Sequence, residues 1–234
     1  MCKESKKSKT GMNLRIANSY ELLEFLKAQN LLPPLDVKRF QTQKQACWWW
    51  PNALSFEVII GAILVQNTRW EQVSSALESL KNCNLLDLES LGVIPLVSLQ
   101  SLIQNVGFYR QKAERIQRLC QNILASFGDY ESFCAQVSRE WLLSQKGIGE
   151  ETCDAILCYG LGREVMVADR YTYKLLRSYG YTLESYCDLQ EWLECGITEN
   201  YDKVCALYGF QIPLNLLFAR FHGKIVEYCK QHKI

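Results

Sequence analysis

Short helical segments, separated by glycine or asparagine breaks, fill the sequence from Pro51 almost to its last residue. In each segment apolar residues recur three or four positions apart, as on one face of an α-helix, and alternating strand patterns are scarce. The expected helices cover 19–31, 54–66, 69–81, 97–105, 110–126, 130–136, 138–145, 150–161, 169–178, 188–194, 199–207 and 213–230. The first of them has Ser19 as its expected N-cap and ends before Pro33. We therefore predict an all-α fold of short helices packed at angles rather than a long bundle.

The composition is that of a globular protein, with 48% hydrophobic and 22% charged residues in a chain of 234. No uninterrupted apolar run approaches the roughly 20 residues that span a bilayer, and the polar, basic start does not resemble a signal peptide. We expect a cytoplasmic protein whose residues 1–12 form a disordered basic tail. The net charge of +1 leaves nucleic acid open as a partner, because an enzyme acting at one lesion needs only a local basic surface.

The eleven cysteines contain no CxxC pair and are scattered along the chain. A disulfide framework and a metal site are the alternatives to consider for so many thiols. For a cytosolic chain we favour buried free thiols that act as small apolar side chains.

A Gly-x-Gly turn joins two expected helices at Lys146, Gly147, Ile148 and Gly149. Two glycines one residue apart permit backbone dihedrals that are closed to other residues. We expect Ile148 to anchor the turn in the core while the free amides face outward, where they suit a DNA phosphate. An ordinary helix–helix turn is the alternative, because a lone Gly-x-Gly is weak evidence.

Asp169 lies twenty residues beyond Gly149 and follows the apolar run from Met166 to Ala168. It opens the next expected helix, where the helix dipole favours a carboxylate. We therefore expect Asp169 to cap that helix, and a capping role is compatible with a catalytic one.

The run from Leu142 to Leu175 resembles the helix-hairpin-helix DNA glycosylase superfamily, which includes endonuclease III. Further segments similar to the family are Gly61–Thr68, Gly107–Ala113 and Phe221–Lys224, in the family's order. The resemblance, which covers roughly residues 20 to 230, implies a partner in double-stranded DNA and two helical domains with the active site in the cleft between them. The implied domains are a barrel-like one at 52–160, which contains the hairpin, and a second one built from 13–51 and 161–234.

Two departures from the endonuclease III pattern narrow the implied chemistry. Glu151 stands 18 residues before Asp169, where bifunctional members carry the lysine that forms a Schiff base. Because a carboxylate cannot form an imine, we expect no lyase step. Endonuclease III relatives also end with four clustered cysteines, whereas only Cys229 follows Gly223 here, so no iron-sulfur cluster, other metal or cofactor is expected.

The string Cys47-Trp48-Trp49-Trp50-Pro51-Asn52, together with Gln66–Trp70, resembles the bacterial 3-methyladenine DNA glycosylase III subfamily. That resemblance implies a monofunctional base-excision repair enzyme that flips alkylated purines such as 3-methyladenine out of DNA and hydrolyses their N-glycosidic bond. Such bases are cationic, so aromatic rings stacked on them gain up to about 2 kcal/mol from cation–π attraction. By resemblance Trp49 and Pro51 form one wall of the pocket, Trp70 the other, and Trp50 lines it. Three consecutive tryptophans cannot all point inward from one element, so at least one needs another role.

The resemblance also assigns roles to charged residues. Asp169 is the catalytic residue, which stabilises the positive sugar and orients or deprotonates the attacking water. Glu151 and Lys224 line the pocket. A protonated Lys224 would repel a cationic base, so we expect a partner carboxylate, a lowered pKa or a covalent modification to neutralise it.

DNA handling falls to three places in the same comparison. The turn from Lys146 to Gly149 binds phosphate, Gln66 fills the gap left by the flipped nucleotide, and Phe108 wedges the opposite strand. The side chains expected to contact phosphates are those of Arg69, Arg110 and Lys112.

Other readings of the sequence remain open. One is a glycosylase for mismatched or oxidised bases, another is a hairpin module that binds DNA without catalysis, and a third is a bifunctional lyase. No sequence feature indicates oligomerisation, and a monomer is expected.

Overall fold

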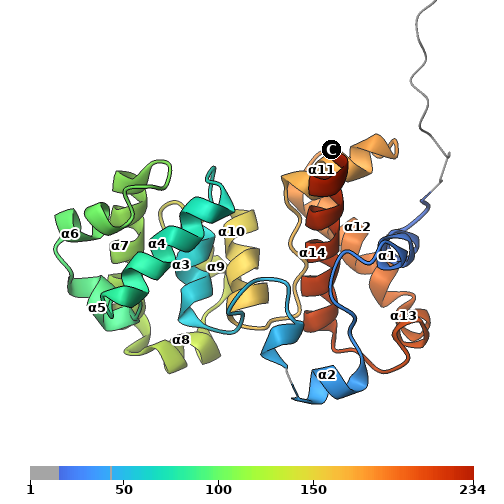
Figure 1. Ribbon diagram of the computed structural model, residues 1–234, viewed down its shortest axis with the longest axis horizontal. Helices are drawn as coiled ribbons and strands as arrows, with labels where there is room; N and C mark the ends of the chain where they lie inside the picture. The colour runs from blue at the N-terminus through green and yellow to red at the C-terminus, as the bar shows by residue number, and fades with distance from the viewer. Residues whose placement is uncertain (1–15, 43) are drawn as a thin grey trace, which may run out of the picture.

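A computed structural model of the protein describes residues 16–42 and 44–234, and within these ranges it contains helices and no strand (Figure 1). The predicted all-α class is therefore confirmed. The basic tail predicted at 1–12 lies outside the described residues. The helices are α1 (Ser19–Ala28), α2 (Val37–Thr42), α3 (Phe56–Leu64), α4 (Trp70–Asn82), α5 (Leu88–Val93), α6 (Leu96–Leu102), α7 (Tyr109–Phe127), α8 (Tyr130–Gln136), α9 (Arg139–Leu143), α10 (Glu150–Ala155), α11 (Arg170–Ser178), α12 (Tyr186–Thr198), α13 (Tyr201–Tyr208) and α14 (Leu214–His232).

The helices form two groups, seen side by side in Figure 1. Helices α3 to α10 pack on one another, with α7 against α3, α5, α6 and α8. In the other group α14 packs against α1 and α11, and α12 packs against α1 and α13. The N-terminal α1 thus lies among the last helices of the chain, the arrangement that a domain built from both chain ends requires. The exact domain boundaries stay a prediction.

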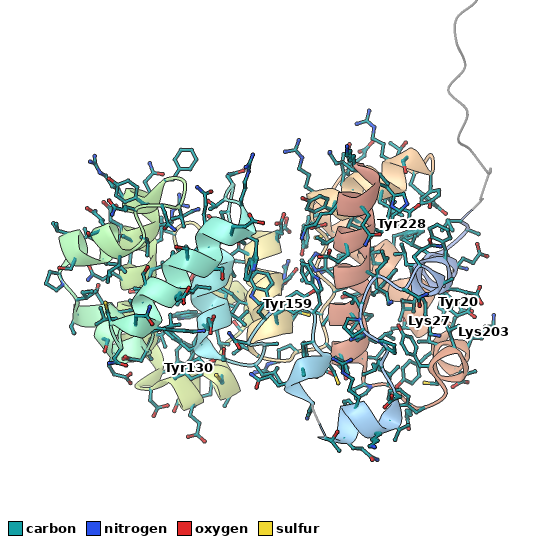
Figure 2. All side chains as sticks on the ribbon, viewed as in Figure 1. Tyr20, Lys27, Tyr130, Tyr159, Lys203 and Tyr228 are labelled. Carbon is teal, nitrogen blue, oxygen red and sulfur yellow. The ribbon has the colours of Figure 1, made fainter. Side chains whose placement is uncertain are left out.

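A single π-helical turn, η2 (Ile156–Gly160), continues α10 and touches both groups through α3 and α14. The wide turn is closed by the Leu161 amide, which donates to the Ile156 carbonyl at 3.1 Å. Short π turns inside helices occur often at functional sites. This one carries Tyr159, which lies between the two groups in Figure 2.

Three details of the predicted helices are wrong. The N-cap of α1 is Asn18, whose side chain accepts from the Glu21 amide, while Ser19 is buried and donates its hydroxyl to the Leu193 carbonyl at 2.7 Å. Helix α2 is absent from the predicted helices, because no residue in it is buried and no apolar stripe marks it. Helix α5 is also absent from the predicted helices, because its six residues are too few to show a periodic pattern.

The thiols follow the prediction only in part. No disulfide joins two of the ten described cysteines. The buried ones are Cys47, Cys120, Cys153, Cys158 and Cys229. The other five are exposed or half-buried, so the expectation that these thiols fill the core is wrong for half of the described set.

Candidate functional site

The hairpin turn between α9 and α10 has the anchored form that its sequence predicts, with Ile148 buried at 7% exposure. Gly147 has a φ of +88°, and a Cβ there would collide with Arg115, so this position requires glycine. Gly149 is different. Its φ of −96° suits any residue, and a Cβ would meet no atom within 4 Å. The expectation that both glycines serve backbone conformation is therefore wrong for Gly149, whose missing side chain leaves the exposed turn open to a partner.

Cationic side chains surround the turn. A cavity of about 10 Å³, room for about one water, opens beside it. Its lining includes Arg115, Arg118, Lys146 and Gly147. This concentration of positive charge suits the phosphate contact predicted for the turn.

Gln66 is tied to the same hairpin. Its amide nitrogen donates to the Gly147 carbonyl and to Thr152 Oγ1, both at 3.0 Å, and its Oε1 accepts from Arg115 at 3.2 Å. A Gln66 side chain that entered DNA would have to exchange these three bonds for new ones. Phe108, the predicted wedge, is 67% exposed and needs no such exchange.

Asp169 caps α11 as predicted. Its Oδ1 accepts from the Thr172 amide at 2.8 Å and from the Thr172 hydroxyl at 3.0 Å. Its Oδ2 lies 3.4 Å from His222 Nε2, and the two side chains are only 11% and 6% exposed. Burial raises the pKa of Asp169, but the charge and hydrogen bond of His222 and the two bonds from Thr172 outweigh it and lower the pKa below its usual value. The carboxylate is thus held as an anion.

His222 is part of a chain of contacts that sequence reasoning missed. Its Nδ1 lies 2.7 Å from the Tyr159 hydroxyl, which in turn lies 2.8 Å from the Ala219 carbonyl. If the hydroxyl donates to the carbonyl, Nδ1 must carry a proton, and Nε2 must carry one too for its contact with Asp169 to attract. If the hydroxyl donates to Nδ1, the neutral ring carries its proton on Nε2. In both arrangements Nε2–H points to Asp169, and at 3.4 Å it acts as an electrostatic contact rather than a short hydrogen bond.

Glu151, in the first turn of α10, faces the same pair of side chains. The residue is exposed overall, yet its carboxylate is partly desolvated by the surrounding protein. Burial and the negative charge of Asp169 raise the pKa of Glu151, and the His222 ring opposes them. Asp169, Glu151 and His222 therefore form one electrostatic cluster, drawn from three helices.

The three consecutive tryptophans differ in burial, and the pocket roles assigned to them stay predictions. Trp48 and Trp50 are buried at 7% and 8% exposure, and Trp49 is half-buried. The centroid of the Trp50 ring lies 6.3 Å from that of the Trp49 ring and 5.6 Å from that of the Trp70 ring, and both pairs of rings are nearly perpendicular. The predicted wall residues thus lie next to one another, with Trp50 between the other two. Pro51, by contrast, is exposed.

Trp49 lies directly against α14. It meets the His222 ring edge-on at 5.4 Å, and its indole N–H donates to Glu227 at 3.1 Å. A Cβ on Gly223 would come within 2.6 Å of Trp49 Cβ, so the indole fits against α14 only because this residue is glycine. Packing against Trp49 therefore explains the glycine in the segment Phe221–Lys224.

Lys224 is buried at 4% exposure. Burial, followed by the positive charges of Arg220 and Lys27, lowers the pKa of Lys224 to about 8. No carboxylate among the described residues forms an ion pair with it. Of the three ways in which its charge was expected to be neutralised, the lowered pKa is the one that its surroundings favour.

The three side chains expected to contact phosphates differ in exposure. Arg69 and Arg110 are exposed, as such contacts require. Lys112 is only 1% exposed and donates to three protein oxygens, so its assignment as a phosphate contact is wrong.

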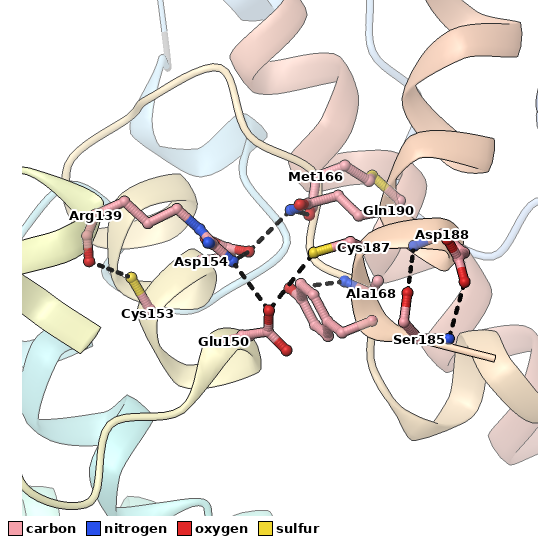
Figure 3. Close-up of polar contacts among 11 residues, drawn as sticks. Arg139, Glu150, Cys153, Asp154, Met166, Ala168, Ser185, Cys187, Asp188 and Gln190 are labelled. Carbon is pink, nitrogen blue, oxygen red and sulfur yellow. Dashed lines mark hydrogen bonds and ion pairs between the residues drawn. The ribbon is translucent and has the colours of Figure 1, made fainter. Parts of the chain in front are cut away.

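A polar network ties the hairpin helix to the segment before Asp169 (Figure 3). Asp154, fully buried, accepts from Arg139 at 2.8 Å and from Gln190 at 2.8 Å. Gln190 also donates to the Met166 carbonyl at 2.6 Å. The network therefore sets how α10 lies relative to the segment that delivers Asp169.

Within the described ranges, no group of three or more His, Cys, Asp or Glu side chains is arranged to hold a metal ion. The described helices also include none long and apolar enough to cross a membrane.

Comparison with known proteins identifies DNA repair proteins as relatives of this chain. The family described as HhH-GPD superfamily base excision DNA repair protein matches residues 60–191. The chain is 33% identical over 189 residues to a proposed DNA repair glycosylase of Methanocaldococcus jannaschii, covering 78% of this chain and 80% of that protein. It is 29% identical over 126 residues to endonuclease III of Thermotoga maritima, covering 54% of this chain and 57% of that protein.

Solved structures show the same relationship. The crystal structure of H. pylori 3-methyladenine DNA glycosylase bound to 1,N6-ethenoadenine is 44% identical and superposes with a TM-score of 0.83, over 92% of this chain and 98% of that one. A trapped endonuclease III–DNA covalent intermediate is 17% identical with a TM-score of 0.67, over 94% of this chain and 89% of that one, and shows the shared fold alone.

Proposed function

This chain belongs to the HhH-GPD superfamily of base excision DNA repair proteins, and we propose that it hydrolyses the N-glycosidic bond of alkylated purines in double-stranded DNA. The observation that carries the proposal is the similarity, at 44% identity over 92% of the chain, to a 3-methyladenine DNA glycosylase. The local geometry supports it, because a carboxylate held as an anion, Asp169, contacts His222, whose ring in turn meets Trp49.

Asp169 is the proposed catalytic residue. As the C1′–N bond breaks, its electron pair leaves with the base and neutralises the positive ring, while positive charge develops on the sugar. The Asp169 carboxylate stabilises that charge and accepts a proton from the water that attacks C1′. His222 and Thr172 hold the carboxylate in its ionised state.

Trp49, Trp50 and Trp70 are the proposed base-binding residues. Electron-rich rings favour a cationic purine, and the near-perpendicular packing of Trp50 on its two neighbours suits a floor between two walls. Pro51 is exposed beside Trp50, where it can extend the wall. Lys224, whose pKa is lowered to about 8, is still mostly protonated at neutral pH, but it loses its proton more readily than an ordinary lysine when a cationic base binds beside it.

We propose that the enzyme has no lyase activity, because Glu151 cannot form an imine with the sugar. The DNA-handling pair in this proposal is Gln66, which fills the gap left by the flipped nucleotide, and Phe108, which wedges the opposite strand. The turn from Lys146 to Gly149 binds a phosphate. No iron-sulfur cluster or other cofactor takes part in this proposal, and the protein acts as a monomer.

The decisive test is chromatography of the bases released from methylated duplex DNA. Wild-type protein should release 3-methyladenine, and Asp169→Asn should release it at least about a hundredfold more slowly, because it loses the charge that stabilises the sugar. Asp129→Asn is the matched control, since Asp129 also caps a helix but lies exposed at the start of α8. Release by Asp169→Asn at the wild-type rate would remove the catalytic assignment. Borohydride treatment should trap no covalent protein–DNA adduct, and an adduct would reinstate a lyase.

The same assay separates the other readings. A duplex with 1,N6-ethenoadenine belongs in the substrate set, because the H. pylori relative was solved with that base. Mismatched and oxidised duplexes complete the set. Preferential release from these last two would replace alkylated purines as the substrate.

A further inference from the structure

One fully buried lysine, Lys112, takes no part in the proposed chemistry. It lies in the first turn of α7, at 1% exposure. Its ammonium donates to the Leu64 carbonyl, the Gln66 carbonyl and Thr68 Oγ1, each at 2.7 Å. These three bonds use all three of its donors.

The partners of Lys112 belong to the two segments that carry the DNA-handling pair. Two of them are carbonyls at the end of α3 and in the turn that bears Gln66. The third, Thr68 Oγ1, also accepts from the Gly107 amide at 3.2 Å, one residue before Phe108. One ammonium therefore links the Gln66 turn to the Phe108 turn through Thr68.

Both turns are held in unusual backbone conformations. Phe108 has a φ of +56°, a region that a bulky residue rarely adopts, and Asn67 has a φ of +50°, in the same region, which asparagine tolerates better. At Gly107 a Cβ would lie 3.3 Å from both Asn67 O and Thr68 Oγ1, so the turns are in tight contact. Surrounding contacts must maintain such a geometry, and the lysine supplies the strongest hydrogen bonds between the two turns.

Burying a cation among neutral oxygens is costly, and an apolar residue would fill the space more cheaply. Burial, followed by the charge of Arg115, lowers the pKa of Lys112 to about 8, so at neutral pH most molecules keep the ammonium and its three donors. The carbonyl end of α3 adds a favourable dipole. The unfavourable burial of Lys112 is explained if this residue fixes the geometry of the two turns rather than stabilising the fold.

We propose that Lys112 is a positioning residue that holds the Gln66 and Phe108 turns at a fixed separation, so that both side chains enter the duplex together when a nucleotide is flipped. The inference rests on the proposed function only for the roles of those two side chains. It assigns Lys112 an effect on double-stranded substrate and none on the hydrolysis of a base that is already unstacked.

Lys112→Met tests this inference, because it keeps an unbranched side chain, one heavy atom shorter, and removes the donors. The first readout is the fluorescence of 2-aminopurine placed opposite an abasic-site analogue in a duplex, which rises when side chains displace it from the stack. The second is release of 3-methyladenine from the same sequence as a duplex and as a single strand. We expect at least about a tenfold loss of duplex release, little change on the single strand, and loss of most of the fluorescence rise.

Two further variants keep the test decisive. Ile123→Val removes a methylene from the core of the same helix and controls for loss of packing, so it should behave as wild type. Thr68→Val removes the oxygen that joins Lys112 to the Gly107 amide and leaves the lysine in place. It should show the same loss of duplex release and of fluorescence rise, so it provides the test if Lys112→Met does not fold.

The outcomes are separable from those of the proposed function. An unchanged fluorescence rise in Lys112→Met or Thr68→Val, or equal losses on single and double strands, would overturn the positioning role. A wild-type protein that produces the fluorescence rise but releases no base would instead refute the glycosylase proposal and leave the positioning role standing.

Discussion

The contact between His222 and Asp169 makes the strongest quantitative prediction. At 3.4 Å, opposite unit charges attract by about 5 kcal/mol at an effective dielectric constant of about 20. If the ring is neutral, only the dipole of its Nε2–H group interacts with the carboxylate, and the attraction is weaker. Water screens either interaction little, because the two side chains are only 6% and 11% exposed.

Replacing His222 by Phe removes this interaction and little else. The ring keeps its edge contact with Trp49, and the Tyr159 hydroxyl retains the Ala219 carbonyl as its acceptor. Asp169 is then left with its two bonds from Thr172 against the burial that raises its pKa. Because about 1.4 kcal/mol changes an equilibrium tenfold, base release at pH 7 should fall by at least about tenfold.

The pH dependence gives the prediction its sign. Catalysis needs the ionised carboxylate, and the wild-type pKa of Asp169 is lowered, so activity is retained until the pH falls through that low value. Without His222 the pKa of Asp169 rises, and the acid limb of the single-turnover rate moves to higher pH. In the wild type, the stability contributed by the pair is present above the unfolded-state pKa of Asp169 and is lost as the pH falls through its lowered folded-state pKa, whereas the variant lacks this contribution.

His232→Phe is the matched control, because the chain has two histidines and the other one is exposed at the end of α14. It should leave the rate and its pH profile unchanged. An acid limb in His222→Phe at the same pH as in the wild type would refute the reasoning, since it would mean that His222 does not set the ionisation of Asp169.

Three further predictions concern the surroundings of the site. Gly223→Ala puts a Cβ within 2.6 Å of Trp49 Cβ, which should cost about 1–3 kcal/mol of unfolding free energy and weaken binding of an alkylated duplex. Binding of a cationic purine should tighten as the pH rises through about 8, because Lys224 then loses its charge, and Lys224→Met should abolish that dependence. Arg139→Met leaves the fully buried Asp154 without its cation and should lower the unfolding free energy in urea by about 3 kcal/mol, the low end for a buried pair because Arg139 is 32% exposed.

Each of these has a control and a contrary result. Gly61→Ala is the control for the glycine test, because its Cβ would meet Trp50 at an ordinary 3.5 Å, and equal effects of the two substitutions would argue against a special contact at Gly223. A pH dependence that survives Lys224→Met must come from another group. An unfolding midpoint unchanged in Arg139→Met would show that Gln190 alone compensates the carboxylate.

Local features were predictable from the sequence. The hairpin, the cap formed by Asp169 and most of the helices depend on residues within a few positions of one another, so periodicity and capping rules identify them. The spacing of apolar residues in α7 also contained a signal, missed in the prediction, that Lys112 is buried. Lys112 lies on the same helical stripe as the buried Ile116, Leu119 and Ile123, and that stripe indicates a buried position rather than a phosphate contact.

The sequence by itself determined an all-α fold, the hairpin and the family to which the chain belongs, because each follows from short-range pattern and motif order. Only the tertiary structure decided what Asp169 touches. His222 lies on a helix that is buried on nearly every side, so periodicity there says nothing about which way a side chain faces. Its approach to Asp169 and Tyr159, from a distant part of the chain, depends on how α11, η2 and α14 pack together, and packing between segments far apart in sequence leaves no local trace.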